Sequence, residues 1–180
     1  MTGNGVDSEA LFTLSYGVYV VTSHRGESLN GQISNTVMQV TDTPPRLAAA
    51  INTRSLTHEF ISNSGVFAVT VLAESAPMKL IGLFGFRSGR DIDKLSQVSY
   101  ETGSTGCPVI HEHALASMEL QVESKLACGT HTVFVGQVVA AGIIGQGRPM
   151  TYAYYREVLG GKTPPTAPTY RASGTVRPRK

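Results

Sequence analysis

The sequence is poor in charge and in cysteine, and it has no long apolar run. Charged residues make up 16% of the 180 residues, below the roughly 25% typical of globular proteins. Part of the surface is therefore expected to be hidden in an oligomer interface or under a ligand. The two cysteines, Cys107 and Cys128, exclude a disulfide framework and favour a reducing, cytoplasmic setting. No apolar stretch reaches the roughly 18 residues of a membrane span, and no signal peptide is recognisable at the N-terminus.

The basic residues are concentrated at the C-terminal end. Five of the 15 basic residues follow Gly160, and none of the 13 acidic residues does. The preceding part holds ten basic against 13 acidic residues, a formal charge of −3, whereas a nucleic-acid-binding domain needs a basic face. Nucleic acid is therefore not expected as a partner. Gly, Pro, Thr and Arg dominate residues 160–180, which predicts a flexible tail after a single domain over residues 1–159.

Several signatures of catalytic and cofactor sites are absent. The chain has no G-x-x-x-x-G-K-[ST] and no G-x-S-x-G, and its G-x-G at 145–147 lacks a third glycine. Cys128 and His131 have the C-x-x-H spacing of half a metal site, which His111 or His113 could complete. A second C-x-x-H is missing, so no metal is expected. Taken alone, His131 fits either a residue at the mouth of a ligand site or a surface residue in a β-turn.

The apolar pattern predicts a mainly β protein with short helices. β-branched and aromatic residues indicate six strands, at 17–23, 31–41, 47–51, 66–72, 115–126 and 132–141. The first two are expected to form a hairpin, and Pro44 and Pro45 to stop the second. Helices are predicted at 55–61 and 76–84, and a loop at 96–114. Six strands with two short helices indicate a small closed antiparallel barrel.

Three polar segments are candidate ligand sites. The loop 84–94 combines three cations with Ser88 and two glycines, a composition that suits an anion; a solvated turn with ion pairs to Asp91 and Asp93 is the alternative. Segment 52–58 follows a strand and opens a helix, so it is either a second anion site or a plain N-cap. Segment 30–36 could contact the edge of a planar heterocycle, although Asn30-Gly31 also fits a hairpin turn.

These segments, in this order, resemble the flavin reductase-like family of FMN-binding split barrels. The resemblance extends over about residues 11–159 and includes GVYVVT at 17–22, NGQISNT at 30–36, NTRSLTH at 52–58, FRSGRDIDK at 86–94 and HTVFVG at 131–136. Within the family, the chain looks most like flavoredoxin and the flavin domain of high-molecular-weight rubredoxins. The resemblance implies a six-stranded antiparallel Greek-key split barrel that holds FMN at or near a homodimer interface.

The resemblance also implies roles for individual residues. His131 matches the family histidine on the nicotinamide side and is the one residue assigned to catalysis. The implied cofactor-binding residues are Gln32, Ile33, Ser34, Asn35, Thr36, Ser55, Leu56, Thr57, Phe86, Arg87, Ser88, Gly89, Arg90, Lys94 and Tyr154. Among these, Ser55, Thr57, Ser88 and Arg90 would hold the phosphate with Lys94 nearby.

Three functions are compatible with these residues. The first is an NAD(P)H:flavin oxidoreductase that takes hydride from NADH or NADPH onto FMN and passes electrons to free flavin or another acceptor. The second is a flavoredoxin-like FMN electron carrier that a redox partner protein reduces. The third is a β-barrel that binds a ligand without redox chemistry. No cysteine follows residue 128, so a second redox centre like that of the rubredoxin-fused relatives is not expected.

Overall fold

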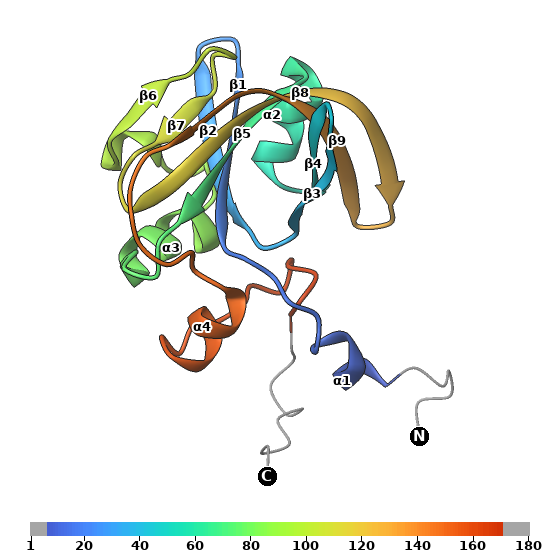
Figure 1. The fold of residues 1–180 in the computed structure, drawn as a ribbon, viewed down its shortest axis with the longest axis vertical. Helices are drawn as coiled ribbons and strands as arrows, with labels where there is room; N and C mark the ends of the chain where they lie inside the picture. Colours follow the sequence, from blue (N-terminus) through green and yellow to red (C-terminus); the bar gives the residue numbers. More distant parts are fainter. Residues whose placement is uncertain (1–6, 171–180) are drawn as a thin grey trace.

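The computed structural model describes residues 7–170, and Figure 1 shows them as a strongly curved β-sheet with two of the helices packed against it. Seven strands form one sheet in the order β2-β1-β5-β8-β9-β4-β3, and every neighbouring pair is antiparallel. The strands are β1 (Tyr19–Arg25), β2 (Ser28–Ser34), β3 (Val37–Asp42), β4 (Pro45–Asn52), β5 (Val66–Leu72), β8 (Ala114–Cys128) and β9 (His131–Ile143). The predicted mainly β, antiparallel fold is confirmed.

The connection between β2 and β3 requires the sheet to curl into a barrel. These strands are the two edges of the sheet, yet only Asn35 and Thr36 separate them in the chain. A link of this length spans roughly 10 Å at most, so the two edges must approach each other there. The Thr36 carbonyl accepts a hydrogen bond from the Ala50 N–H at 3.0 Å, which ties the link to β4. Away from this link, the barrel is split between its two edge strands, β2 and β3.

The main sheet has one strand more than the six predicted. Segment 31–41 was predicted as a single strand, but it divides at Asn35 and Thr36. The Thr36 hydroxyl donates to Asn35 Oδ1 at 3.0 Å, and this local bond accompanies the turn. β4 begins at Pro45, where the sequence predicted only a stop. Proline is tolerated there because the first residue of a strand can lack an N–H donor.

The first two strands form the predicted hairpin, but Asn30-Gly31 is not its turn. The turn is Gly26-Glu27, with Gly26 at a φ of 58°. Asn30 and Gly31 lie inside β2, so the hairpin-turn alternative for this pair is wrong. A Cβ on Gly31 would lie 2.9 Å from Thr22 Cγ2 and 3.1 Å from the Phe84 ring. Glycine at position 31 therefore allows close packing between β2 and the Phe84 side chain.

The predicted loop 96–114 contains regular structure. It holds a short 3-10 helix η1 (Leu95–Gln97) and the two-stranded sheet of β6 (Tyr100–Thr102) and β7 (Pro108–Ile110). The Glu119 carboxylate accepts hydrogen bonds from the backbone N–H and the hydroxyl of both Ser104 and Thr105. This anchor comes from β8, so local periodicity could not reveal it.

Both predicted helices are confirmed, with shifted ends. α2 (Leu56–Ser64) begins after Ser55, whose hydroxyl accepts from the His58 N–H at 3.1 Å, and ends at Gly65 with a φ of 73°. α3 (Met78–Phe86) leads into the loop 87–94. Two further short helices are α1 (Ser8–Leu11) and α4 (Tyr152–Glu157). None of the helices in residues 7–170 is long and apolar enough to cross a bilayer.

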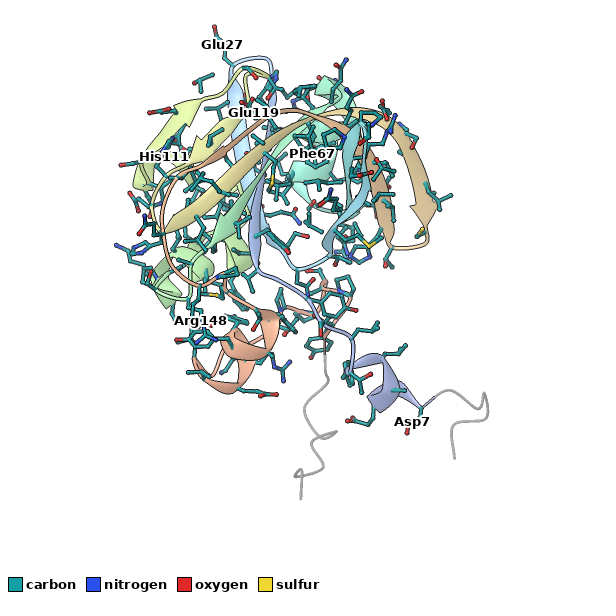
Figure 2. The ribbon with its side chains drawn as sticks, viewed as in Figure 1. Asp7, Glu27, Phe67, His111, Glu119 and Arg148 are labelled. Atoms are coloured by element: carbon teal, nitrogen blue, oxygen red, sulfur yellow. The ribbon has the colours of Figure 1, made fainter. Side chains whose placement is uncertain are left out.

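Two apolar clusters fix the elements around the split. Alternate residues of a strand point to opposite faces, and Val20 and Val21 accordingly enter different clusters. One cluster packs Val21 with Phe67 and Phe134, and Figure 2 shows Phe67 in the interior of the molecule. The other packs Val20 against Phe84 of α3. These clusters hold β2, α2 and α3 in place around one cavity.

Candidate functional site

A cavity of about 600 Å³ lies at the split of the barrel. Its walls come from β2 and the link to β3, from the end of β4 and the first turn of α2, and from the loop after α3. His131 at the start of β9 also lines it. Of the predicted residues, it brings together Gln32, Ile33, Ser34, Asn35, Thr36, Ser55, Leu56, Thr57, Phe86, Arg87, Ser88, Gly89, Lys94 and His131.

The charge of this cavity has one sign. Four basic residues line it, namely Arg54, Arg87, Lys94 and Lys162, and none of its lining residues is acidic. The three polar segments of the sequence thus converge on an electropositive hollow, although residues 7–170 contain all 13 acidic residues. An anionic ligand matches this distribution.

Lys94 is a buried cation without a carboxylate partner. Only 4% of the residue is exposed, and its Nζ donates to the Gly31 carbonyl at 2.9 Å. Burial lowers the Lys94 pKa to about 8, so the amine is still mainly protonated at neutral pH. None of the ion pairs among residues 7–170 involves Lys94. A buried charge of this kind is costly until a counter-charge approaches.

The two predicted anion segments meet beside Lys94. Asn30 Nδ2 on β2 donates to Thr57 Oγ1 in the first turn of α2 at 2.8 Å. A Cβ on Gly89 would lie 2.0 Å from Asn30 Oδ1 and 3.1 Å from Leu56 Cδ2. Only glycine lets the loop approach β2 and α2 this closely. The loop, the strand and the N-terminus of α2 therefore form one wall of the cavity.

Arg90 is not among the residues that line the cavity. Its guanidinium forms an ion pair and hydrogen bond with Glu59 on the exposed side of α2. Hydrogen bonding to Glu59 raises the Arg90 pKa, and the same bond lowers the Glu59 pKa. Arg87, three residues earlier, lines the cavity instead. The expected ion pairs to Asp91 and Asp93 are likewise not among those of residues 7–170.

Farther along β2, further polar groups line the cavity. Gln32 Oε1 is buried and has no hydrogen-bond partner within the described part of the chain. Neighbouring groups are already engaged: the Thr36 N–H donates to Ser34 Oγ at 3.4 Å, and Asn35 Nδ2 donates to Thr169 Oγ1 at 2.8 Å. Buried polar atoms are normally paired, so a ligand that donates to Gln32 would satisfy an open acceptor.

His131 lies at the rim formed by β4 and β9, where it pairs in register with Asn52. One ring nitrogen, Nδ1, lies 2.9 Å from Thr130 Oγ1. Partial burial lowers the His131 pKa, so the ring is neutral at neutral pH. The other nitrogen is left for a ligand. No group of three or more His, Cys, Asp or Glu within residues 7–170 could hold a metal ion.

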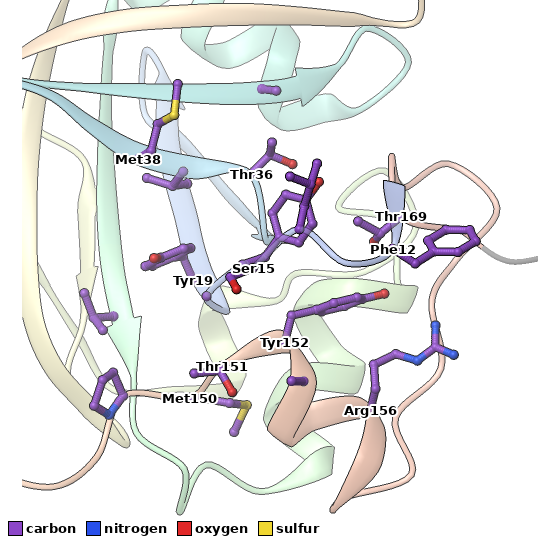
Figure 3. Close-up of a pocket in the computed structure, with 18 of the residues that line it drawn as sticks. Phe12, Ser15, Tyr19, Thr36, Met38, Met150, Thr151, Tyr152, Arg156 and Thr169 are labelled. Carbon is purple, nitrogen blue, oxygen red and sulfur yellow. The ribbon is translucent and has the colours of Figure 1, made fainter. Parts of the chain in front are cut away.

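Tyr154 does not line this cavity. It lies on α4, and its backbone N–H donates to Thr151 Oγ1 at 3.1 Å. Tyr152 and Arg156 of α4 instead face a second hollow of about 1,320 Å³, which Figure 3 shows together with Phe12, Tyr19 and Met38. Thr36 and Ala50 line both hollows, so the two adjoin across the start of β3.

Sequence reasoning missed one wall of the site, the segment 162–168. Its composition predicted a flexible tail, yet Asn52 Nδ2 donates to the Thr166 carbonyl at 3.0 Å and Thr169 is buried. The pair Gly160-Gly161 between α4 and this segment was the available signal of a defined turn.

The division at residue 159 and the flexibility of the tail stay predictions, and residues 171–180 lie outside the described part. Asn30, Asn52 and Arg54 also line the site; they belong to the candidate segments 30–36 and 52–58 but were not among the implied cofactor-binding residues.

Comparisons with known proteins agree with this geometry. The family described as "Flavin reductase like domain" matches residues 11–161. A high-molecular-weight rubredoxin of Moorella thermoacetica is 46% identical over 92% of this chain and 72% of its own length. A ferric-chelate reductase (NAD(P)H) of Archaeoglobus fulgidus is 42% identical over 92% of this chain and 98% of its own. Among solved structures, flavoredoxin from Methanosarcina acetivorans superimposes with a TM-score of 0.68 at 25% identity, covering 83% of this chain and 79% of that one.

Proposed function

Because the chain belongs to the flavin reductase-like domain family, we propose that it is an NAD(P)H:flavin oxidoreductase with FMN in the cavity at the split of its barrel. The observation that carries the proposal is the acid-free cavity around the unpaired ammonium of Lys94. A phosphate monoester supplies the missing counter-charge. FMN ends in one such group and supplies a hydride-accepting ring when bound.

The residues divide into a phosphate end and a ring end. Arg87 and Lys94 offer charge, while Ser88 and the first turn of α2 offer hydroxyl and N–H donors. The polar edge at Gln32 lines the cavity farther along β2. Its open acceptor suits the N–H of a heterocycle. The protein thus holds the cofactor at both ends and leaves the transfer of hydride to the ring.

His131 is the residue proposed to orient the nicotinamide. Its neutral ring has one nitrogen beside Thr130 and one left for a ligand. Such a nitrogen can hydrogen-bond the nicotinamide carboxamide and needs no change of protonation during the reaction. The A. fulgidus relative, whose name states NAD(P)H, supports a nicotinamide donor for this chain as well.

A titration tests the proposal directly. Purified protein is expected to be yellow, to release FMN on denaturation, and to lose its flavin absorbance when NADH or NADPH is added under anaerobic conditions. Free flavin or ferric chelate added next should restore the absorbance if electrons pass to such acceptors. A yellow protein that neither nucleotide bleaches contradicts the reductase assignment.

The second candidate is an FMN electron carrier that a partner protein reduces. The 46% identity to a protein named high-molecular-weight rubredoxin and the structural match to a flavoredoxin favour it. In that case FMN binds tightly, NADH and NADPH bleach it negligibly, and a reduced ferredoxin or rubredoxin bleaches it quickly. A colourless protein that takes up no FMN would support the third function, a barrel without redox chemistry.

The proposal includes a homodimer and a cytoplasmic location. Met38 and Val40 on the edge strand β3 are exposed apolar residues, and a second copy could cover them. The hollow beside them adjoins the cofactor cavity, which supports the proposal that FMN lies at or near the interface. Free Cys107 and Cys128 support a reducing compartment.

A further inference from the structure

The chain turns sharply around a tyrosine before it reaches the cavity. Gly160 has a φ of 65°, and a Cβ on Gly161 would lie 2.2 Å from the Tyr155 ring. The Gly161 N–H donates to the Tyr155 carbonyl at 2.8 Å, and the Tyr155 hydroxyl donates to the Lys162 carbonyl at 2.6 Å. Two glycines and one buried phenol thus shape the turn, and Tyr152 and Arg156 contact the Thr163 hydroxyl just beyond it. The turn directs residues 162–169, here called the strap, toward the split of the barrel.

The strap lines the cavity along its length and is held again at its far end. Residues 162–168 line the cavity, and the Ala167 N–H donates to the Pro164 carbonyl at 3.0 Å within them. Asn52 Nδ2 donates to Thr166 O in the middle of the strap. At its far end, Thr169 is only 6% exposed and accepts from Asn35 Nδ2 at 2.8 Å.

We propose that the strap retains FMN, so that the flavin is a prosthetic group that stays bound through many turnovers rather than a substrate that exchanges. This inference rests on the proposed function of the cavity. Three prolines, at 164, 165 and 168, restrict the backbone of the strap, which lowers the entropy lost on ordering it. A ligand inside the cavity is then released only after one end of the strap detaches.

The anchors of the strap can be weakened by substituting residues that do not themselves line the cavity. Neither Tyr155 nor Thr169 lines it. The double variant Tyr155→Phe/Thr169→Val removes one hydroxyl bond at each end and keeps the side-chain volumes. Tyr100→Phe/Thr102→Val on β6 makes the same chemical changes on exposed residues elsewhere and is the matched control.

The measurement is the rate at which FMN leaves the loaded full-length protein. The complex is mixed with excess apoflavodoxin as a trap, and release is followed by flavin fluorescence. A neutral hydrogen bond corresponds to roughly a two- to tenfold factor, so the double variant should release FMN on the order of tenfold faster. The control should release it at the wild-type rate. Bleaching by NAD(P)H at saturating FMN should persist in both.

Two outcomes separate the strap from the proposed function. If wild-type protein binds FMN and the double variant releases it at the wild-type rate, the strap does not retain the cofactor. If wild-type protein takes up no FMN, the function itself is wrong. Thermal unfolding of the loaded proteins checks that the double variant is folded. If it is not, Thr169→Val alone provides the test, with an expected acceleration of at least twofold.

Discussion

At the scale of single residues, the cavity is arranged for a ligand at the expense of the empty protein. Lys94 keeps a positive charge in a buried position with one carbonyl as its partner. Burial disfavours this charge, which is why the Lys94 pKa falls to about 8. The same cation would bind a phosphate strongly, because water screens it little. Loss of this charge should therefore raise the stability of the protein without cofactor and lower its affinity for the cofactor.

Lys94→Met is predicted to weaken FMN binding and to stabilise the apoprotein. A hydrogen bond to a charged group contributes about 1.5–3 kcal/mol, so the FMN dissociation constant should rise about 10- to 100-fold. Because the folded pKa of about 8 lies below the usual 10.5, the unfolded state binds more protons between these values. Wild-type stability therefore rises with pH in this window, by up to about 3 kcal/mol. Urea unfolding of the wild-type and Lys94→Met apoproteins at pH 7 to 10 measures this pH dependence of stability.

Arg90→Met is the control for this prediction. Arg90 lies four residues from Lys94, but its charge is paired with Glu59 outside the cavity. Its removal should change the FMN dissociation constant by less than about threefold, in keeping with the small value of exposed ion pairs. Equal losses of FMN affinity in Lys94→Met and Arg90→Met would contradict the separation of the two cations.

The sequence led to residues that line the cavity where local chemistry decides their position, and their role in binding stays a prediction. The hydroxyl of Ser88 and the amide of Gln32 lie in the cavity because loop and strand carry them there directly. Arg90 lies outside the cavity because Glu59, distant in the chain, binds its guanidinium. Tyr154 lies outside it because no residue of α4 lines this cavity, and several α4 residues line the larger hollow instead. A pattern of residue types reveals neither of these placements.

At the scale of elements, one carboxylate anchors the turn between β6 and β7. Glu119→Gln on β8 is predicted to lower the free energy of unfolding by about 2 kcal/mol at pH 7, because charge-assisted bonds to Ser104 and Thr105 are replaced by poorer ones. Burial opposes ionisation of Glu119, but these hydrogen bonds prevail and lower its pKa. The stabilisation is full above the ordinary carboxyl pKa and disappears as the pH falls through the folded value.

Urea unfolding at pH 7 and at several values down to 3.5 checks this prediction. The difference between wild-type protein and Glu119→Gln should shrink as the pH falls below about 4. Glu101→Gln on β6 is the control, because Glu101 is exposed and pairs only with His111 at 3.4 Å. It should cost less than about 0.5 kcal/mol. A difference for Glu119→Gln that stays constant with pH would exclude the carboxylate as its source.

The elements that the sequence missed are those fixed by distant partners. The strong strands β5, β8 and β9 and the capped helix α2 follow from their own residues, so their prediction was confirmed. The hairpin of β6 and β7 has three residues a strand and depends on Glu119. The strap has the composition of a tail and depends on Tyr155, Asn52 and Asn35. Tertiary contacts override local preference in both.

At the scale of the whole molecule, the topology itself creates the site. Because the edge strands β2 and β3 are joined by two residues, the sheet closes at Thr36 and stays split beyond it. The cavity occupies that split, and the larger hollow shares Thr36 and Ala50 with it. β3 is an edge strand whose apolar residues Met38 and Val40 are exposed, a combination that proteins usually cover.

Met38→Asp is therefore predicted to shift a homodimer toward monomer and to accelerate FMN release. Met38 is 66% exposed in the single chain and lines the larger hollow, so burying a carboxylate there opposes association. Light scattering after size exclusion gives the mass, and a fluorescence trap gives the release rate. Tyr100→Asp on β6 is the control, because β6 belongs to the separate two-stranded sheet. A monomeric wild-type protein, or a Met38→Asp dimer as stable as wild type, would place the second copy elsewhere or exclude it.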